Sequence, residues 1–270
     1  MHDLPSAEAA AVMTIDGLKY AVIGSGSSAN SYIFDYNGYA FIVDNGFSCK
    51  QAMERAQKLG FNTENVKYIF LTHSHDDHFR GIEVLSRKLK APVVLHQELN
   101  VNRKIKKHFY KRKDILPGGF YTDGDFRFRA FETSHDADHS LSYHFQLGPA
   151  FFTIITDTGA VSDEMMEFAS GSDVLFLEAN YNERMLDEGP YPYFLKQRIT
   201  SEHGHLSNVD ALRFLNEAGN RTGTRLKEVY FCHLSDTNNS PEALTKDIER
   251  ELAWDGSWVI CRKGQMQKQL

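Results

Sequence analysis

The stretch Thr72-His73-Ser74-His75-Asp76-Asp77-His78 comes directly after the apolar run Tyr68-Ile69-Phe70-Leu71. A buried strand is predicted for the apolar run, and it would deliver the following side chains to one point at its C-terminal end. Four of those side chains can bind a metal ion, namely His73, His75, Asp77 and His78. Neutral imidazoles and a carboxylate suit Zn²⁺, Fe²⁺ or Mn²⁺ better than Ca²⁺ or Mg²⁺. The alternative is a solvated turn rich in His and Asp by chance, and the specific His-x-His-x-Asp-His order disfavours it.

The composition is that of an ordinary globular protein. The 270 residues are 41% hydrophobic and include 19 Phe and 12 Tyr, which is ample material for a core. A net charge of −6 argues against a surface that is basic all over, but it does not exclude a local basic groove. The three cysteines, Cys49, Cys232 and Cys261, are odd in number and widely spaced. They predict neither a disulfide framework nor a Cys-rich zinc site, and they favour a reducing cytosol.

Targeting and membrane signals are weak. Residues 1–13 carry Asp3 and Glu8 and lack both a basic start and a long apolar core, which argues against a signal peptide. No run approaches the ~20 apolar residues that cross a bilayer. We therefore expect a soluble, cytoplasmic protein without membrane contact. A flexible tail is expected over residues 1–14 and a single domain over residues 15–270, because no linker or low-complexity segment divides the chain.

Strand and helix signals alternate along the chain. Asn37-Gly38 is a hairpin turn signal between two apolar runs, and Ser48 with Gln51 forms a capping box for a helix ending at Gly60. Strands are expected at residues 18–23, 32–34, 39–43, 68–71, 93–95, 126–131, 141–146, 151–156, 174–177, 229–232 and 258–261. Further helices are expected at residues 81–90, after Ser207, and at 241–252. Polar clusters recur just past the strand ends, where sites in α/β proteins usually gather.

Three further polar residues follow expected strands. His135 comes after the strand ending at Phe131, Asp157 after the strand at 151–156, and His233 after the strand at 229–232. Each of them alone is more often a hydrogen-bonding loop residue than a ligand. All three would project from the same edge as residues 73–78, so together they predict one larger metal site.

In these residues the chain resembles the metallo-β-lactamase superfamily, from the segment 24–28 to His233. The superfamily's five motifs appear in order as Asp44, the run 73–78, His135, Asp157 and His233. The resemblance implies an α/β (α+β) fold, a four-layered αββα sandwich with a dinuclear metal centre at one edge. It assigns His73, His75 and His135 to one metal and Asp77, His78 and His233 to the other, with Asp157 bridging them and Asp44 orienting a ligand by a hydrogen bond.

Two divalent metal ions at such a site favour hydrolysis. They lower the pKa of a shared water from ~16 towards neutrality, which supplies a bridging hydroxide as nucleophile, and they hold an anionic substrate. The resemblance implies hydrolysis too, because redox members of the superfamily carry a carboxylate where this chain has His75. Asp77 is therefore counted among the catalytic residues as well as the ligands. Zn²⁺ and Mn²⁺ are the expected ions, and Fe²⁺ also fits this ligand set.

Glu178 and His205 narrow the class of hydrolase. Glu178 directly follows an apolar strand, and His205 precedes a helix start in Gly204-His205-Leu206-Ser207-Asn208. This pairing resembles superfamily nucleases and phosphodiesterases, in which such a His, steadied by a Glu, lies beside the scissile phosphate. It can protonate the leaving alkoxide or hydrogen-bond a phosphoryl oxygen. The alternatives are a hydrogen-bonding role at the helix start for His205 and a surface position for Glu178.

The chain more specifically resembles the bacterial YycJ/WalJ family, whose members are described as 5′–3′ DNA exonucleases. The relevant segments are Gly24-Ser25-Gly26-Ser27-Ser28, Gly46-Phe47-Ser48-Cys49-Lys50, Ser134-His135-Asp136-Ala137, Glu178-Ala179-Asn180, Gly204-His205-Leu206-Ser207-Asn208 and His233-Leu234-Ser235 with Asn238-Asn239. The resemblance implies a nucleic acid substrate, DNA in particular, and no obligate protein partner can be inferred. Two alternatives are a hydrolase of small esters, thioesters or lactones, which would usually lack the 204–208 segment, and a metal-binding scaffold protein.

A basic segment covers residues 103–113. Seven of its eleven residues are cationic, and His108-Phe109-Tyr110 lies among them. Basic side chains neutralise phosphates and aromatic rings stack on unpaired bases, so the segment predicts nucleic acid binding. A solvated helix face is the alternative. The candidate residues are Arg103, Lys104, Lys106, Lys107, Lys111, Arg112 and Lys113.

Overall fold

Two seven-stranded sheets form the centre of the molecule in a computed structural model that describes residues 15–101 and 108–269. The expected tail over residues 1–14 lies outside the described residues. The first sheet contains β1 (Leu18–Gly24), β2 (Ser31–Tyr36), β3 (Tyr39–Val43), β4 (Val66–Phe70), β5 (Val93–His96), β6 (Arg112–Ile115) and β14 (Gln267–Lys268). The second contains β7 (Phe120–Asp123), β8 (Phe126–Glu132), β9 (Leu141–Leu147), β10 (Ala150–Ile155), β11 (Val174–Glu178), β12 (Glu228–Cys232) and β13 (Ser257–Ile260).

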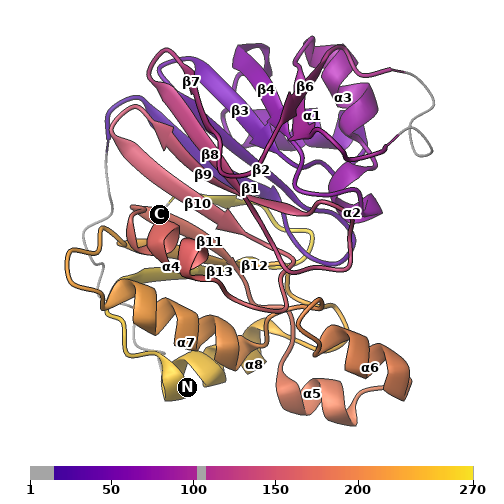
Figure 1. Ribbon diagram of the computed structural model, residues 1–270, viewed down its shortest axis with the longest axis vertical. Helices are drawn as coiled ribbons and strands as arrows, with labels where there is room; N and C mark the ends of the chain where they lie inside the picture. Colours follow the sequence, from indigo (N-terminus) through magenta and orange to yellow (C-terminus); the bar gives the residue numbers. More distant parts are fainter. Residues whose placement is uncertain (1–14, 102–107, 270) are drawn as a thin grey trace.

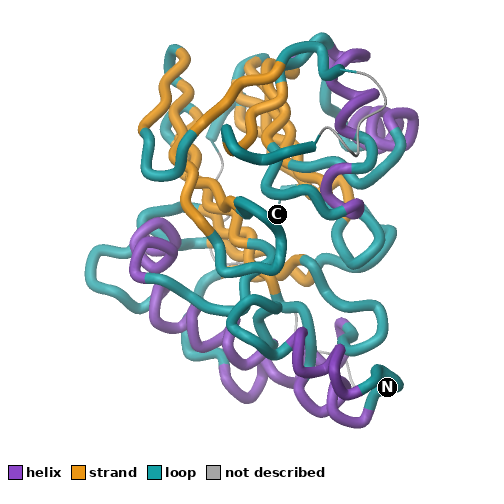
Figure 2. Tube along the Cα trace, turned by 45° about the vertical axis from the view of Figure 1, so that its right-hand side comes forward, coloured by secondary structure: helices purple, strands orange, loops and turns teal. Residues whose placement is uncertain are grey.

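Helices cover the outer face of each sheet (Figures 1 and 2). The described helices, including two that stand apart from the sheets (α5 and α6), are α1 (Cys49–Lys58), the 3₁₀ helix η1 (Thr63–Asn65), α2 (Asp76–Phe79), α3 (Ile82–Leu89), α4 (Asp163–Ser170), α5 (Glu183–Glu188), α6 (Tyr193–Ile199), α7 (Asn208–Gly219) and α8 (Pro241–Glu251). α1 and α3 pack on the first sheet, and α4, α7 and α8 pack on the second. The predicted four-layered αββα sandwich is confirmed.

Strand direction explains why polar side chains collect at one edge. In the first sheet β3 to β6 are parallel, and in the second β10 to β13 are parallel. β8 runs in the same direction as β10, because each is antiparallel to β9. Strands that run the same way end at the same edge of a sheet, so the loops after β8, β10, β11 and β12 leave from one side.

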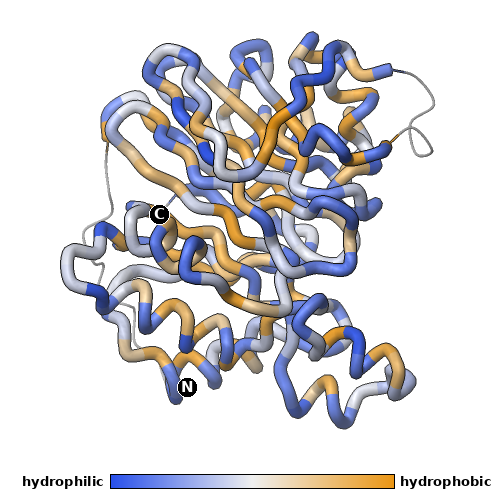
Figure 3. Tube along the Cα trace, viewed as in Figure 1, coloured by the Kyte–Doolittle hydropathy of each residue, from blue (hydrophilic) through white to orange (hydrophobic). Residues whose placement is uncertain are grey.

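An aromatic core holds the two sheets face to face. Phe34 and Phe41 of the first sheet pack against Phe145 of the second, with ring centroids 6.2 and 4.6 Å apart. Phe70, the last residue of β4, also packs on Phe145 at 5.0 Å. Buried aromatic rings contribute large apolar areas and prefer fixed relative orientations. This layer sets the spacing between the loops that leave the two sheets, and Figure 3 shows apolar residues along the strands of both sheets as well as in the covering helices.

Most of the expected elements are present within a residue or two. Asn37 and Gly38 have φ of 50° and 82°, as a tight hairpin turn between antiparallel β2 and β3 requires. Ser48 and Gln51 form the expected capping box. The sequence analysis missed the strands β6, β7 and β14 and the helices η1, α2 and α4 to α6. β6 shows that the solvated-helix alternative for the basic segment is wrong where the structure describes it, because Arg112 and Lys113 lie in an extended strand.

Within residues 15–101 and 108–269, no helix combines the length and the apolar character needed to cross a membrane.

A partly buried histidine in the second sheet, His144, makes stability depend on pH. Burial lowers the pKa of His144 to about 4, and Arg129 on the neighbouring strand adds to the effect. Its Nδ1 lies 2.8 Å from the hydroxyl oxygen of Thr153, and its ring stacks on Phe168 at 4.8 Å. The neutral form is favoured in the folded state, so the unfolded chain binds one more proton between pH 6.5 and 4.

We expect His144→Gln to reduce the acid sensitivity of folding. In the wild type the stability associated with His144 is fully present above pH 6.5 and is lost as the pH falls towards 4, by about 3 kcal/mol. The variant lacks this titration, so the difference in unfolding free energy between the two proteins should narrow as the pH is lowered. Urea unfolding at pH 7 and pH 5 measures it, and a constant difference would contradict the prediction.

Candidate metal centre and active site

Three of the predicted site residues occupy a left-handed backbone conformation directly after a strand. Asp44 follows β3, Asp157 comes two residues after the end of β10, and His233 follows β12, with φ of 56°, 56° and 57°. Residues other than glycine rarely adopt positive φ, although Asp, Asn and His tolerate it better than most. Such strain clusters at functional sites. Here the sharp turn aims each side chain back across the strand ends.

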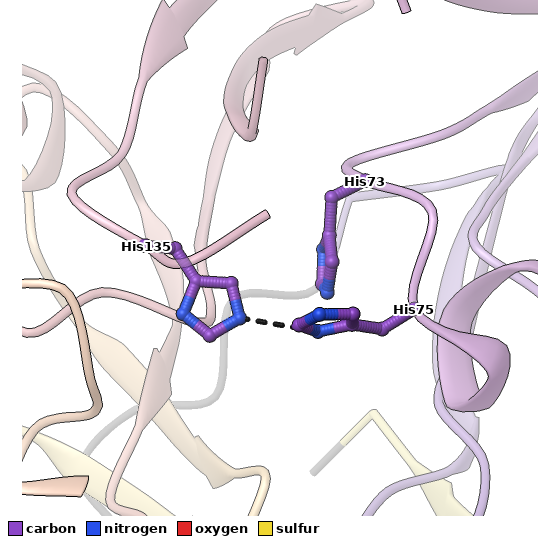
Figure 4. A group of neighbouring side chains, drawn as sticks. All are labelled: His73, His75 and His135. Carbon is purple, nitrogen blue, oxygen red and sulfur yellow. Dashed lines mark hydrogen bonds between the residues drawn. The ribbon is translucent and has the colours of Figure 1, made fainter. Parts of the chain in front are cut away.

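The residues of the 73–78 run come from the loop after β4 and from α2. His73 and His75 lie in the loop, and Asp77 and His78 lie in the single turn of α2, which His75 precedes at the N-cap position. His73, His75 and His135 point toward one another from two sides of the site (Figure 4), and His135 Nε2 lies 3.3 Å from His75 Nδ1. The three rings form the first of two ligand clusters.

The second cluster combines Asp77, His78 and His233. Asp77 Oδ2 lies 3.3 Å from the Nε2 atoms of both His78 and His233. Asp157 lies between the clusters, because its carboxylate oxygens are 3.2 Å from His78 Nε2 and 3.7 Å from His135 Nε2. The structure therefore brings all seven predicted ligands together.

These spacings fit metal ligation. A tetrahedral ion with ligand bonds of about 2.0–2.1 Å holds its ligand atoms about 3.4 Å apart, as follows from the bond lengths. The contacts within and between the clusters span 3.2 to 3.7 Å. Among the described residues, His73 Nε2 is buried without a hydrogen-bond partner. Buried polar atoms are otherwise nearly always paired, so this atom is free to coordinate an ion.

A second set of contacts orients the ligand rings. The Nδ1 atoms of His73, His78, His135 and His233 each have a hydrogen-bonding oxygen at 2.7–3.1 Å, on Thr72, Asp44, Gly204 and Glu178 respectively. A proton on each Nδ1 satisfies that oxygen and leaves Nε2 as a free lone pair facing the centre. This arrangement is typical of metal-binding histidines.

Asp44 is completely buried, and it contacts both Thr72 and His78. Its Oδ1 accepts a hydrogen bond from the Thr72 amide at 2.8 Å, and its Oδ2 accepts one from the Thr72 hydroxyl at 2.7 Å. The same Oδ2 lies 2.7 Å from His78 Nδ1. Burial raises the pKa of Asp44, while His78 and Thr72 oppose that effect by stabilising the carboxylate.

The carboxylates also control the charge of the imidazoles. Burial and the neighbouring imidazoles hold the pKa of His73 well below its usual value. Burial opposes protonation of His78 as well, but Asp157, Asp77 and Asp44 outweigh it and raise the pKa of His78 well above the usual value. An ion that binds His78 must displace this proton, because only the neutral ring is a ligand.

Glu178 connects the metal clusters to His205. Its Oε1 lies 2.7 Å from His205 Nδ1 and 2.8 Å from His233 Nδ1, and its Oε2 accepts the backbone amides of Thr158 and Leu206. The surface alternative for Glu178 is therefore wrong, because the side chain is fully buried. Burial opposes protonation of His205, but Glu178 outweighs it and raises the pKa of His205. The His205 side chain is 19% exposed, so it can reach a bound molecule.

The structure adds residues that sequence reasoning missed. Asn30 is fully buried, and its side-chain nitrogen lies 3.1 Å from Asp77 Oδ2 and 3.1 Å from His78 Nε2. Gly46 permits the close packing of this loop, because a Cβ there would lie 1.9 Å from the Asp77 carbonyl oxygen. Nothing in the sequence distinguishes Asn30 from any other loop asparagine.

A pocket opens over the clusters. His75, Asp77, Asp157, His205 and His233 line its floor. One wall comes from the segment that contains α6, through Tyr191, Leu195, Arg198 and Ile199. The sequence analysis assigned no role to this segment.

The basic segment is only partly described. Arg103, Lys104, Lys106 and Lys107 lie outside the described residues. Arg112 donates hydrogen bonds to the carbonyl oxygens of Leu99, His96 and Gln97, so its guanidinium stabilises the local fold. The Lys113 ammonium lies over the ring of Tyr68, 4.7 Å from its centroid. Nucleic acid binding by Lys111 and the rest of the segment stays a prediction.

Comparison with known proteins identifies the family. Residues 39–234 match the β-lactamase superfamily domain. The chain is 35% identical to exodeoxyribonuclease WalJ of Streptococcus pneumoniae serotype 2 over 243 residues, which cover 88% of this chain and 89% of that protein. It is 32% identical to exodeoxyribonuclease YycJ of Bacillus anthracis over 246 residues, covering 90% and 92%. This chain therefore belongs to the metallo-β-lactamase superfamily, and within it to the family of the WalJ and YycJ proteins.

Solved structures agree on the fold. The metallo-β-lactamase fold protein YhfI from Bacillus subtilis superposes with a TM-score of 0.71 at 21% identity, over 93% of this chain and 98% of that one. The short form of human tRNase Z gives a TM-score of 0.63 at 15% identity, over 93% and 99%. The two ligand clusters are those of a dinuclear metallohydrolase of this fold.

We expect Asp44→Asn to weaken metal binding by about 10- to 100-fold, as losses of such orienting contacts typically do. The amide can still accept a hydrogen bond from Thr72, but its NH₂ group cannot accept the Nδ1 proton of His78. Competition with a chromogenic chelator measures the change. Asp35→Asn is the matched control, because Asp35 is also a buried carboxylate and accepts a hydrogen bond from Gly38 in the β2–β3 hairpin. Equal metal affinity in the two variants would show that Asp44 does not orient a ligand.

Proposed function

We propose that this protein is a two-metal DNA exonuclease that degrades DNA in the 5′–3′ direction. The observation that carries the proposal is the buried Glu178–His205 pair, whose imidazole lines the same pocket as both ligand clusters. A site that only bound metal would have no need of an additional oriented imidazole. The activity named for the WalJ and YycJ relatives, which match about nine-tenths of the chain, supports a DNA substrate.

We assign the ligands as the sequence analysis did. His73, His75 and His135 would hold one ion and Asp77, His78 and His233 the second, with Asp157 available to both because it lies between the two clusters. Mixed imidazole and carboxylate ligands favour Zn²⁺ or Mn²⁺, with Fe²⁺ also compatible. When bound, two metal ions would lower the pKa of a bound water molecule and offset the negative charge of a phosphodiester. Asp44 and Asn30 fix the position of His78 and Asp77 from behind.

His205 is the residue that acts on the substrate itself. Because Glu178 accepts the Nδ1 proton, the ring is held in one orientation and its Nε2 is directed away from the carboxylate. A proton on Nε2 can then pass to the leaving alkoxide as the P–O bond breaks, or donate a hydrogen bond to a phosphoryl oxygen. Glu178 positions both His205 and His233, so it couples the proton donor to the second ligand cluster.

The substrate class can be tested directly. Protein loaded with Zn²⁺ or Mn²⁺ is incubated with single- and double-stranded DNA labelled at either end, with RNA, and with thioester and lactone substrates. We expect release of mononucleotides from the 5′ end of DNA, and loss of that activity in Asp77→Ala. Turnover of a thioester or lactone without cleavage of any nucleic acid would overturn the proposal in favour of a small-molecule hydrolase.

The role of His205 predicts a dependence on the leaving group. We expect His205→Ala to lower kcat for DNA by about 10²- to 10⁴-fold, the usual contribution of a general acid. A nucleotide p-nitrophenyl ester releases a stabilised phenolate that needs no proton, so its loss should be much smaller. His203→Ala is the matched control, because His203 contacts Ser134 at 3.0 Å and lies in neither cluster. Equal losses on both substrates would exclude a proton-donor role for His205.

A further inference from the structure

The helix α6 exposes two neighbouring aromatic rings beside the candidate active site. Among the described residues, Tyr193 and Phe194 are the most exposed large hydrophobic side chains, at 74% and 72%. No residue of α6 is buried. The α5–α6 pair stands apart from the helices that cover the second sheet (Figure 1). Apolar rings gathered on a helix that contributes nothing to the core indicate a surface that meets another molecule.

This helix is continuous with the pocket over the metal clusters. Leu195, Arg198 and Ile199 line that pocket. Phe194 lies four positions before Arg198, so the two side chains are neighbours on the same side of the helix. A molecule bound at the metal clusters that extends past Arg198 therefore reaches the ring of Phe194. Tyr193 is directed along the helix instead, because Gln197 donates a hydrogen bond to its hydroxyl group at 2.8 Å.

The charge of α6 suits a polyanion. The helix carries Lys196 and Arg198 and no carboxylate, in a chain whose net charge is −6. The Arg198 side chain is 55% exposed and contacts Asp136, the residue next to the predicted ligand His135. Carboxylates do occur nearby, but Glu183 and Asp187 line a different pocket, the one between α5 and α6. Lys196 and Tyr193 line that other pocket too, so Arg198 is the cation of α6 on the side of the clusters, where it lies beside Leu195 and Ile199.

We propose that α6 is a platform for single-stranded nucleic acid, on which a base next to the scissile phosphate stacks on Phe194 while Arg198 contacts the adjoining phosphate. The proposal rests on the proposed nuclease function. Stacking on an exposed ring is tolerant of sequence, because every base has a flat π face. The Arg198 guanidinium next to the Phe194 ring matches the alternation of phosphate and base along a nucleic acid strand. Phe194 is a positioning residue: it holds the strand so that the next phosphodiester lies at the clusters.

The test compares a long and a short substrate. For Phe194→Ala we expect KM for a single-stranded oligodeoxynucleotide to rise about 10-fold, as the loss of one base stack predicts. The ratio of kcat/KM between this oligonucleotide and a nucleotide p-nitrophenyl ester should fall by a similar factor, because the ester has no second base to stack. Phe194→Trp, which restores a larger ring, should recover wild-type KM.

The matched control is Phe120→Ala. Phe120 is 64% exposed, but it lies on β7, far from α6 in Figure 1. This variant should resemble the wild type on both substrates. If Phe194→Ala keeps the wild-type ratio of kcat/KM between the two substrates, the platform is overturned. Equal losses of kcat/KM on both substrates would also overturn it, because they indicate a disturbed active site. Sedimentation of the wild type and of Phe194→Ala tests one more alternative. If the wild type is a dimer and the substitution dissociates it, α6 is a subunit contact and the proposal fails.

Two outcomes separate this inference from the nuclease proposal. If the wild type cleaves no nucleic acid, the proposed function fails and the platform fails with it. If the wild type degrades DNA but Phe194→Ala does so with unchanged KM, only the platform fails. Arg198→Gln gives an independent measurement, since each phosphate contact on a single strand contributes about 0.7 to the slope of log affinity against log salt. We expect that slope to decrease by about this amount, and an unchanged slope would contradict the phosphate contact.

Discussion

The site depends on holding several carboxylates and imidazoles together away from water. Removing a charge from water costs several kcal/mol per ion unless a partner compensates it. Asp157 and Glu178 are 2% and 0% exposed, and each has an imidazole nitrogen or a backbone amide beside it. The need to compensate buried polar groups also explains why oxygens of Thr72, Asp44, Gly204 and Glu178 accept hydrogen bonds from the Nδ1 atoms of the ligand rings. Each contact that offsets burial also fixes a ring in the orientation that metal binding needs.

This arrangement exists only if the two sheets keep one relative position. Asp44 and the 73–78 run come from the first sheet, whereas His135, Asp157 and His233 come from the second. The close-packed aromatic layer between the sheets resists sliding, because displacing one ring forces its neighbours to move. Metal and catalytic sites require ligand positions accurate to about 0.5 Å. The large inter-sheet core is therefore a condition for the site as well as for the stability of the fold.

The two ligand clusters and the segment that forms the pocket wall have different roles. The ligand clusters supply chemistry that is common to many hydrolases of this fold, and they do not by themselves select a substrate. The chain between Glu178 and His205 forms α5 and α6, so the two residues that point to phosphodiester chemistry flank the segment that forms one wall of the pocket. Changes in such a segment can alter which substrates reach the metals without disturbing the ligands.

The sequence by itself determined the local features. Turn and cap signals such as Asn37-Gly38 and Ser48 with Gln51 predicted their elements because they act over a few residues. The spacing of residues 73–78 and the position of later His and Asp residues after strands predicted which side chains converge, because parallel strands end at one edge. The short helices α5 and α6 carry no such pattern, and the sequence analysis missed them.

Only the tertiary structure decided the contacts between distant segments. The burial of Glu178 between His205 and His233 overturned its surface alternative, and the position of Asn30 against Asp77 had no sequence signal. At Arg112 and Lys113, within the described part of the basic segment, the strand β6 overturned the helix alternative. Hydrogen bonds between residues tens of positions apart depend on how the sheets and loops pack. Local sequence specifies the elements, and packing in three dimensions determines which of their side chains meet.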